Sequence, residues 1–297
     1  QPIARFLIKI MTEEAIYNRQ ELWFGADGQS IIENVKVAIV GIGGTGSHVA
    51  QQLAYLGIQN LTLIDADKVN ETNLNRLVGA NNEDIGKLKV DIGKRLINFI
   101  NKKAKVTAVP DTFISELGIA ALKKTDFIFG CVDKDGARLL LTEFCKAYYK
   151  SYLDIATEID EDGWGGRIVF SDNQKGCLVC RGQLSKEEIH RDLSSPEDRS
   201  VDDKIYGVPK EKMKSTGPAV ISLNGTLVSL AVTEFLVHVT NLRPIKRHLE
   251  YRGKMGIVVI PNDDLQEDCY YCKSVLGIKD GVDIYKYLRQ GINKILR

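Results

Sequence analysis

The stretch from 35 to 67 constrains this chain more than any other part of its sequence. It reads VKVAIV, then GIGGTGSH, then an apolar periodic segment, then a second apolar run that ends in IDAD. A β-branched apolar run followed by glycines and an amphipathic segment predicts a strand, a tight turn and a helix. With the second run, the stretch predicts one β–α–β unit of a parallel sheet.

The turn of this unit predicts a nucleotide site. Glycines let the main chain approach a phosphate, and the free N–H groups of a helix start attract anions. The glycines are Gly41, Gly43, Gly44 and Gly46. Asp65, at the end of the second apolar run, suits ribose hydroxyls.

These residues alone do not identify which nucleotide binds. Gly41, Gly43 and Gly46 fit the G-x-G-x-x-G pattern of dinucleotide-binding folds, and Asp65 follows at about the expected spacing. On this stretch alone, an NAD-linked oxidoreductase is the first interpretation. A strand–turn–helix packing motif without any ligand is the alternative that requires no function.

Composition limits the class of protein. The 297 residues carry a formal net charge of +1, which argues against nucleic-acid or membrane-surface partners. No apolar run approaches the ~20 residues of a transmembrane helix, and no signal-peptide cleavage pattern follows the opening residues QPIARFLIKIM. We therefore expect a cytoplasmic protein with reduced thiols.

Strand and helix patterns alternate up to residue 156. Strands are predicted at 35–40, 61–64, 106–109, 127–131 and 152–156, and helices at 84–102, 116–123 and 138–149. This alternation predicts an α/β fold with a doubly wound, mostly parallel, Rossmann-like sheet.

A different pattern follows residue 156. Strands at 165–170, 249–251 and 256–260 predict an antiparallel half that continues the sheet, and 219–239 reads as a long helix. We divide the chain into an N-terminal helical segment (1–33), one domain (34–276) that includes a mobile loop (183–214), and a C-terminal helical tail (277–297).

Four of the six cysteines form two C-x-x-C pairs. They are Cys177, Cys180, Cys269 and Cys272. Two such pairs typically close a tetrahedral zinc site, and four thiolates leave no open position for catalysis. The sequence thus predicts structural zinc, with four unrelated buried cysteines as the alternative. Cys131 and Cys145 read as buried core residues.

Charged side chains gather after the second and fourth predicted strands. Asp65, Asp67, Asn73 and Arg76 follow one strand, Lys89 lies at the next helix, and Asp133 follows the fourth strand. Singly, such residues are often solvated charges or helix caps. Because strand ends of a doubly wound sheet converge, their joint occurrence favours a triphosphate with Mg²⁺ over NAD.

Five sequence motifs and two cysteine pairs together resemble one known family. They are Tyr17-Asn18-Arg19-Gln20, Gly41-x-Gly43-Gly44-x-Gly46, Asp65-x-Asp67-x-Val69-x-x-x-Asn73-Leu74-x-Arg76, Gly86-x-x-Lys89, Cys131-x-Asp133-x-x-x-x-Arg138 and the two cysteine pairs. In this order, across residues 17 to 272, the chain resembles the ThiF/MoeB/HesA branch of the ubiquitin-activating superfamily.

The resemblance implies a role for each of these positions. Asp65 would bind ribose, while Asn73, Arg76 and Lys89 would contact the phosphates of ATP. Asp133 would hold Mg²⁺, with assistance from Asp67. The family works as dimers, so the resemblance implies a homodimer in which Arg19 reaches the partner's ATP.

The implied reaction is adenylation of a carboxylate. The family's usual substrate is the C-terminal glycine of a small ubiquitin-like protein of the ThiS or MoaD type, and some members adenylate short peptides or other carboxylates. The segment 183–214 has no cysteine, so we expect no thioester on this chain. Lys134 stands where the family often has Asn.

Three rival functions stay open. An NAD-linked oxidoreductase would leave Arg76, Lys89, Asp133 and the cysteine pairs without a role. A non-catalytic scaffold would be expected to have lost some of these residues. Activation of a small carboxylate borne on RNA fits poorly with the near-neutral charge.

Overall fold

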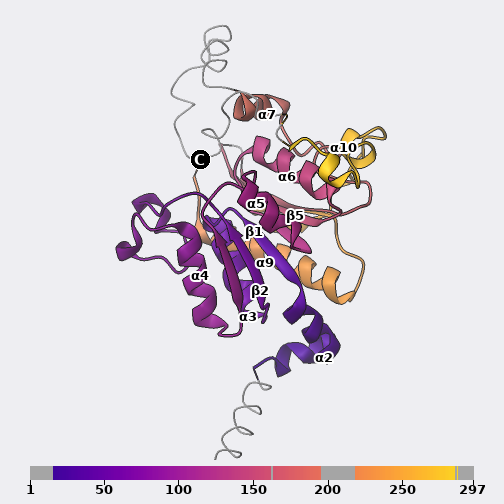
Figure 1. Ribbon diagram of the computed structural model, residues 1–297. Coiled ribbons are helices and arrows are strands. Elements are labelled where there is room, and N and C mark those ends of the chain that lie inside the picture. The colour runs from indigo at the N-terminus through magenta and orange to yellow at the C-terminus, as the bar shows by residue number, and fades with distance from the viewer. Residues whose placement is uncertain (1–15, 162, 195–217, 285, 287–297) are drawn as a thin grey trace, which may run out of the picture.

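One mixed sheet of eight strands forms the centre of the molecule. The computed structural model describes residues 16–161, 163–194, 218–284 and 286 (Figure 1). The strands lie in the order β3-β2-β1-β4-β5-β6-β7-β8. Their bounds are β1 Lys36–Val40, β2 Asn60–Ile64, β3 Lys105–Val109, β4 Phe127–Gly130, β5 Ser151–Ile159, β6 Trp164–Ser171, β7 His248–Arg252 and β8 Ile257–Val259.

The first five strands are parallel and the last three continue the sheet antiparallel. A tight turn explains the change of direction, because the backbone N–H of Asp160 donates to the carbonyl of Gly163 at 2.9 Å and reverses the chain after β5. The predicted mixed architecture is confirmed.

Helices cover both faces of the sheet (Figure 1). On one face lie α2 (Asn18–Asn34), α3 (Gly44–Tyr55), α4 (Lys89–Ile100) and α9 (Ile221–Thr240). On the other lie α5 (Glu116–Lys123) and α6 (Asp135–Ala147). Two further helices, α7 (Lys186–Leu193) and α10 (Tyr270–Lys273), follow β6 and β8 along the chain.

Alternation along β1 shows why both faces are covered. Val37 and Ile39 belong to the core under α3 and α9, whereas Ala38 and Val40 belong to the core under α6. Successive side chains of a strand point to opposite faces, so an unbroken apolar strand requires burial on both. Full burial of one such aliphatic side chain contributes roughly 1.5–3 kcal/mol.

The helix predicted at 84–102 begins later than expected. Residues Asn82–Asp84 form a short 3₁₀ turn closed by a capping box between Asn81 and Asp84. The backbone at Gly86 then adopts φ +86°, which a helix does not allow. Only from Lys89 is the chain helical, so the expected start at residue 84 is wrong.

Two other segments differ from expectation. The stretch 183–214 contains α7, which was missed because it buries no side chain and so lacks an apolar stripe. The rest of this stretch, 195–214, lies outside the described residues, as do 1–15 and 287–297. Of the tail predicted from 277, the described part includes a short 3₁₀ turn, Lys279–Gly281.

The long helix α9 contradicts the expectation that no segment is long and apolar enough to span a membrane. It has 20 residues with a mean hydropathy of 1.3, so it passes that test by length and composition. However, Leu227, Val228 and Phe235 are fully buried against the sheet and α3. Its apolar character is therefore that of a core helix.

Candidate functional site

A cavity of about 610 Å³ opens at the carboxyl ends of β1, β2 and β4. It lies where β1 separates β2 from β4, the crevice in which doubly wound sheets bind ligands. Its wall includes most of the predicted nucleotide residues. They are Gly41, Gly43, Gly44, Asp65, Asp67, Asn73, Arg76, Lys89 and Asp133.

The glycine turn between β1 and α3 is as tight as predicted. Gly41 has φ +88°, and a Cβ there would lie 2.6 Å from the carbonyl oxygen of Cys131. A Cβ on Gly46 would lie 1.8 Å from the carbonyl oxygen of Gly41. Gly46 therefore shapes the turn from behind and does not line the cavity.

The start of α3 faces this cavity. Gly43 is the N-cap residue, and no side chain caps the helix. Gly43, Gly44 and Thr45 all line the cavity. Because the first N–H groups of a helix have no partner within it, this end can receive an anion.

Asp65 links β2 to the glycine turn. One carboxylate oxygen accepts from the N–H of Ile42 at 2.6 Å, and the other accepts from the N–H of Asp67 at 2.7 Å. Burial raises the pKa of Asp65, although nearby Lys89 and these two N–H groups act in the opposite direction. The carboxylate thus stands fixed at the edge of the cavity.

Lys89 reaches the same edge through a small backbone pairing. The N–H of Lys89 donates to the carbonyl of Asp67 at 3.0 Å. Its ammonium lies 2.6 Å from the Asp67 carboxylate. The carboxylate that was expected to assist Mg²⁺ is therefore paired with a lysine in this state of the protein.

Arg76 lies over the glycine turn. Its Nη1 donates to the carbonyl of Thr72 and to Oδ1 of Asn75. Its Cδ lies 3.2 Å from the point that a Cβ on Gly44 would occupy. Asn73 accepts from the N–H of Asn70 at 3.2 Å, which fixes the short turn that carries Arg76.

Asp133 and Cys131 follow β4 on the opposite side of the cavity. Asp133 is exposed, with its carboxylate open to a hard cation. Cys131 is buried, and burial raises its pKa to about 12. A thiol that stays protonated at neutral pH is a poor nucleophile, which agrees with its interpretation as a core residue.

Arg19 is not part of the cavity within its own chain. It is an exposed residue near the start of α2. The next residue, Gln20, donates to the carbonyl of Leu56 at 3.0 Å, at the end of α3 that faces away from the glycine turn. Arg19 therefore lies apart from the described residues that line this cavity.

A second cavity of about 880 Å³ adjoins the first over β5, β6 and β7. Thr45, Cys131, Asp133 and Thr157 line both. Its floor includes Gly165, where a Cβ would lie 2.0 Å from the carbonyl oxygen of Tyr251. The two cavities together form one path from the antiparallel half to the glycine turn.

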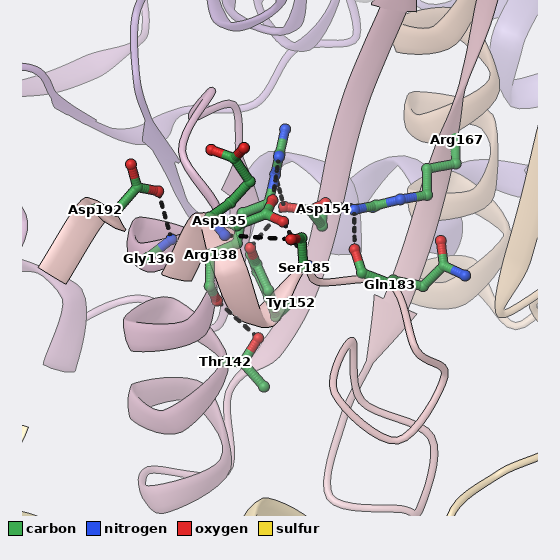
Figure 2. Close-up of polar contacts among 11 residues, drawn as sticks. Asp135, Gly136, Arg138, Thr142, Tyr152, Asp154, Arg167, Gln183, Ser185 and Asp192 are labelled. Atoms are coloured by element: carbon green, nitrogen blue, oxygen red, sulfur yellow. Dashed lines mark hydrogen bonds and ion pairs between the residues drawn. The ribbon is translucent and has the colours of Figure 1, made fainter. Parts of the chain in front are cut away.

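A buried ionic network borders this path and was missed from the sequence (Figure 2). Asp154, which has no exposed surface, accepts from Arg167 at 2.7 Å and from Tyr152 at 2.8 Å. Nε of Arg138 lies 3.5 Å from the same carboxylate. An acidic residue inside an apolar strand was the available signal, since buried charges are paired.

Figure 2 also shows how α6 is tied to the chain that follows β6. Asp135 pairs with Arg138 at 2.8 Å and accepts from the N–H of Ser185 at 2.8 Å. Asp192 accepts from the N–H of Gly136 at 2.9 Å. The start of α6, next to Asp133, is therefore held by two contacts from one distant segment, α7 and its N-cap residue.

The four paired cysteines meet at one point. Their sulfur atoms all lie within 4.8 Å of one another. Sγ of Cys177 is 3.6 Å from that of Cys269, and Sγ of Cys180 is 3.8 Å from that of Cys272. Zn–S bonds of about 2.3 Å in a tetrahedron place sulfurs about 3.8 Å apart, so this donor set fits zinc.

Comparison with known proteins gives a consistent match. A family model described as "ThiF family" matches residues 17–269. The molybdopterin-synthase adenylyltransferase of Escherichia coli is 34% identical over 174 residues, which cover 58% of this chain and 69% of that protein. The ubiquitin-like modifier-activating enzyme 5 of Drosophila grimshawi is 28% identical over 238 residues, or 75% of this chain.

The matched part spans only 54% of the length of the fly protein. Among solved structures, E. coli MccB with ATP superposes with a TM-score of 0.69 at 20% identity, over 86% of this chain and 74% of that one. At this identity the likeness establishes the fold.

Proposed function

Since the chain belongs to the ThiF family, we propose that it is an ATP-dependent adenylyltransferase acting on the C-terminal carboxylate of a small ubiquitin-like protein of the ThiS or MoaD type. The convergence of Asp65, Arg76, Lys89 and Asp133 on one cavity carries this proposal. The relatives named above support it, because one is named an adenylyltransferase and the other a ubiquitin-like modifier-activating enzyme.

In the proposed reaction, a carboxylate oxygen of the substrate forms a bond to the α-phosphorus of ATP. The bond from that phosphorus to the bridging oxygen breaks, and pyrophosphate leaves with the electron pair. The carboxylate is already ionised at neutral pH, so no general base is needed. The protein's task is to position both reactants and to neutralise charge.

The family resemblance supplies each proposed role, and the position of each residue in the cavity supports it. Asp65 binds the ribose hydroxyls, Asn73 and Arg76 contact phosphate, and Lys89 exchanges its Asp67 partner for a phosphate oxygen. Asp133 offers a carboxylate to Mg²⁺, which would neutralise charge on the phosphates when bound.

The homodimer is proposed on the family resemblance, which implies that an arginine at the position of Arg19 serves the partner's nucleotide. The exposed position of Arg19, outside the cavity of its own chain, is compatible with that role. Zinc is proposed at the four cysteines as a structural ion, since four thiolates leave no position for substrate.

The adjoining cavity supports a substrate with an extended C-terminal tail. The tail would lie over β5, β6 and β7 and reach the glycine turn through the shared wall. Gly165 lies along this path, and any side chain there would meet the backbone of β7. A short peptide would fit the same path and is the alternative substrate.

The test is exchange of labelled pyrophosphate into ATP. Purified ThiS-type and MoaD-type proteins ending in Gly-Gly should support exchange, and the same proteins without the last two glycines should not. Exchange with short peptides alone would favour the alternative substrate. Saturable NADH binding without ATP affinity would instead favour the oxidoreductase.

A further inference from the structure

The buried side-chain amide of Asn224 lines the first cavity and has no role in the proposed reaction. Asn224 lies on α9 with only 3% of its surface exposed, between apolar neighbours such as Leu223 and Leu227. Buried side-chain amides nearly always have hydrogen-bond partners. Among the residues that the structure describes, none forms a hydrogen bond with the Asn224 side chain, and this residue lines the cavity.

The amide lies at the start of α3. Its Nδ2 is 2.3 Å from the point that a Cβ on Gly44 would occupy, and Cδ of Arg76 is 3.2 Å from the same point. Gly44 is thus required by the approach of this side chain from a distant helix. Asn224, the first N–H groups of α3 and Arg76 surround one place in the cavity wall.

That place is next to the expected ribose position. Asp65, assigned to the ribose hydroxyls, accepts from the N–H of Ile42 within the same glycine turn. In a nucleotide, the group that follows ribose is the α-phosphate. We propose that Nδ2 of Asn224 donates a hydrogen bond to a non-bridging oxygen of the α-phosphate, in ATP and in the acyl-adenylate, an inference that rests on the proposed function.

A neutral donor suits this position. When the carboxylate attacks, negative charge builds on the non-bridging oxygens of the α-phosphorus, and a fixed donor stabilises it without reorganising. An ammonium or guanidinium on α9 would have to be desolvated among Leu223 and Leu227, at a much larger cost than an amide. Asn224 is therefore a catalytic residue that touches the reacting group.

The test measures binding of ATP, ADP, AMP and adenosine by calorimetry. Asn224→Asp places a carboxylate against the α-phosphate. We expect ATP, ADP and AMP to bind to this variant at least about 10-fold more weakly, because all three contain that phosphate, while adenosine affinity stays unchanged. Asn224→Leu keeps the branched shape and the number of heavy atoms but removes the donor, and it should weaken the three nucleotides by about the same factor as one another.

Thr226→Asp is the matched control, because Thr226 is exposed on the same helix and does not line the cavity. It adds the same charge and should leave all four affinities unchanged. If AMP binds to both Asn224 variants as to wild type, or if Thr226→Asp weakens binding equally, the Asn224 assignment is wrong. If wild type itself binds neither ATP nor AMP, the proposed function fails.

Discussion

Adding one methyl group at Gly46, which does not line the cavity, should disrupt the glycine turn by pressing on the backbone of Gly41. A Cβ at this position would lie 1.8 Å from the carbonyl oxygen of Gly41, whereas real Cβ contacts essentially never fall below 3.0 Å. The turn and the helix must therefore separate by more than an ångström. Gly41 cannot retreat freely, because its N–H donates to the carbonyl of Ile64 at 2.9 Å and a Cβ on it would already lie 2.6 Å from the carbonyl oxygen of Cys131.

Two effects follow for Gly46→Ala. Overpacking at a tight site typically costs about 1–3 kcal/mol of unfolding free energy, and misplacing catalytic groups by about 1 Å lowers rates by about 100-fold. Urea denaturation should show the first effect, and pyrophosphate exchange should show the second. The two losses should appear together, since one displacement causes both.

Gly225→Ala is the matched control for this change. Gly225 also lies in a helix, but a Cβ there would meet His48 at an ordinary 3.5 Å. Replacing glycine by alanine within a helix should raise stability by up to about 1 kcal/mol. The steric reasoning fails if Gly46→Ala unfolds at the wild-type urea concentration and exchanges at the wild-type rate.

The remaining predictions concern metal, dimer, zinc and pH. Asp133→Ala should abolish pyrophosphate exchange, and a wild-type exchange rate would contradict its metal role. Mixing Asp133→Ala subunits with Arg19→Ala subunits should restore one working site per mixed dimer. No rescue on mixing would contradict the contribution of Arg19 to the partner's site. Metal analysis should find about one zinc per chain, and Cys272→Ser should lower both zinc content and melting temperature. The side-chain hydrogen bond from Arg95 holds the pKa of Asp84 well below its ordinary value of 3.8. Its ionised form therefore stabilises the fold above about pH 4, and this contribution is lost as pH falls through the lower folded-state pKa. The melting temperature of Asp84→Asn should accordingly fall less than that of wild type below pH 4.

The strands were predictable because an unbroken run of apolar side chains indicates a strand that is buried on both faces. An apolar run such as 127–131 is required wherever both faces of a strand are covered. Helix α7 could not be found in this way, since it buries no side chain. The start of α4 was misjudged for a related reason, because Ile85 and Leu88 continue the apolar spacing through residues whose backbone is not helical.

Nucleotide-site positions were predictable for a different reason. Residues at the carboxyl ends of neighbouring parallel strands must converge whatever the helices do, so Asp65 and Asp133 had to face one crevice. Asn224 could not be found from the sequence, because its approach to Gly44 depends on how α9 packs against α3. An isolated asparagine in an apolar helix was the only signal for it.

The buried network of Figure 2 explains how the two cavities keep a fixed position relative to each other. Asp154 and Arg167 lie on adjacent antiparallel strands, while Arg138 belongs to α6, whose preceding loop carries Asp133. Removing one partner from a buried ion pair typically costs about 3–5 kcal/mol. The loop with Asp133 therefore cannot shift relative to β5 and β6 at low cost. For a reaction in which a tail lying over β6 must meet a phosphate beside Asp133, such a rigid link fixes the distance that the tail has to span.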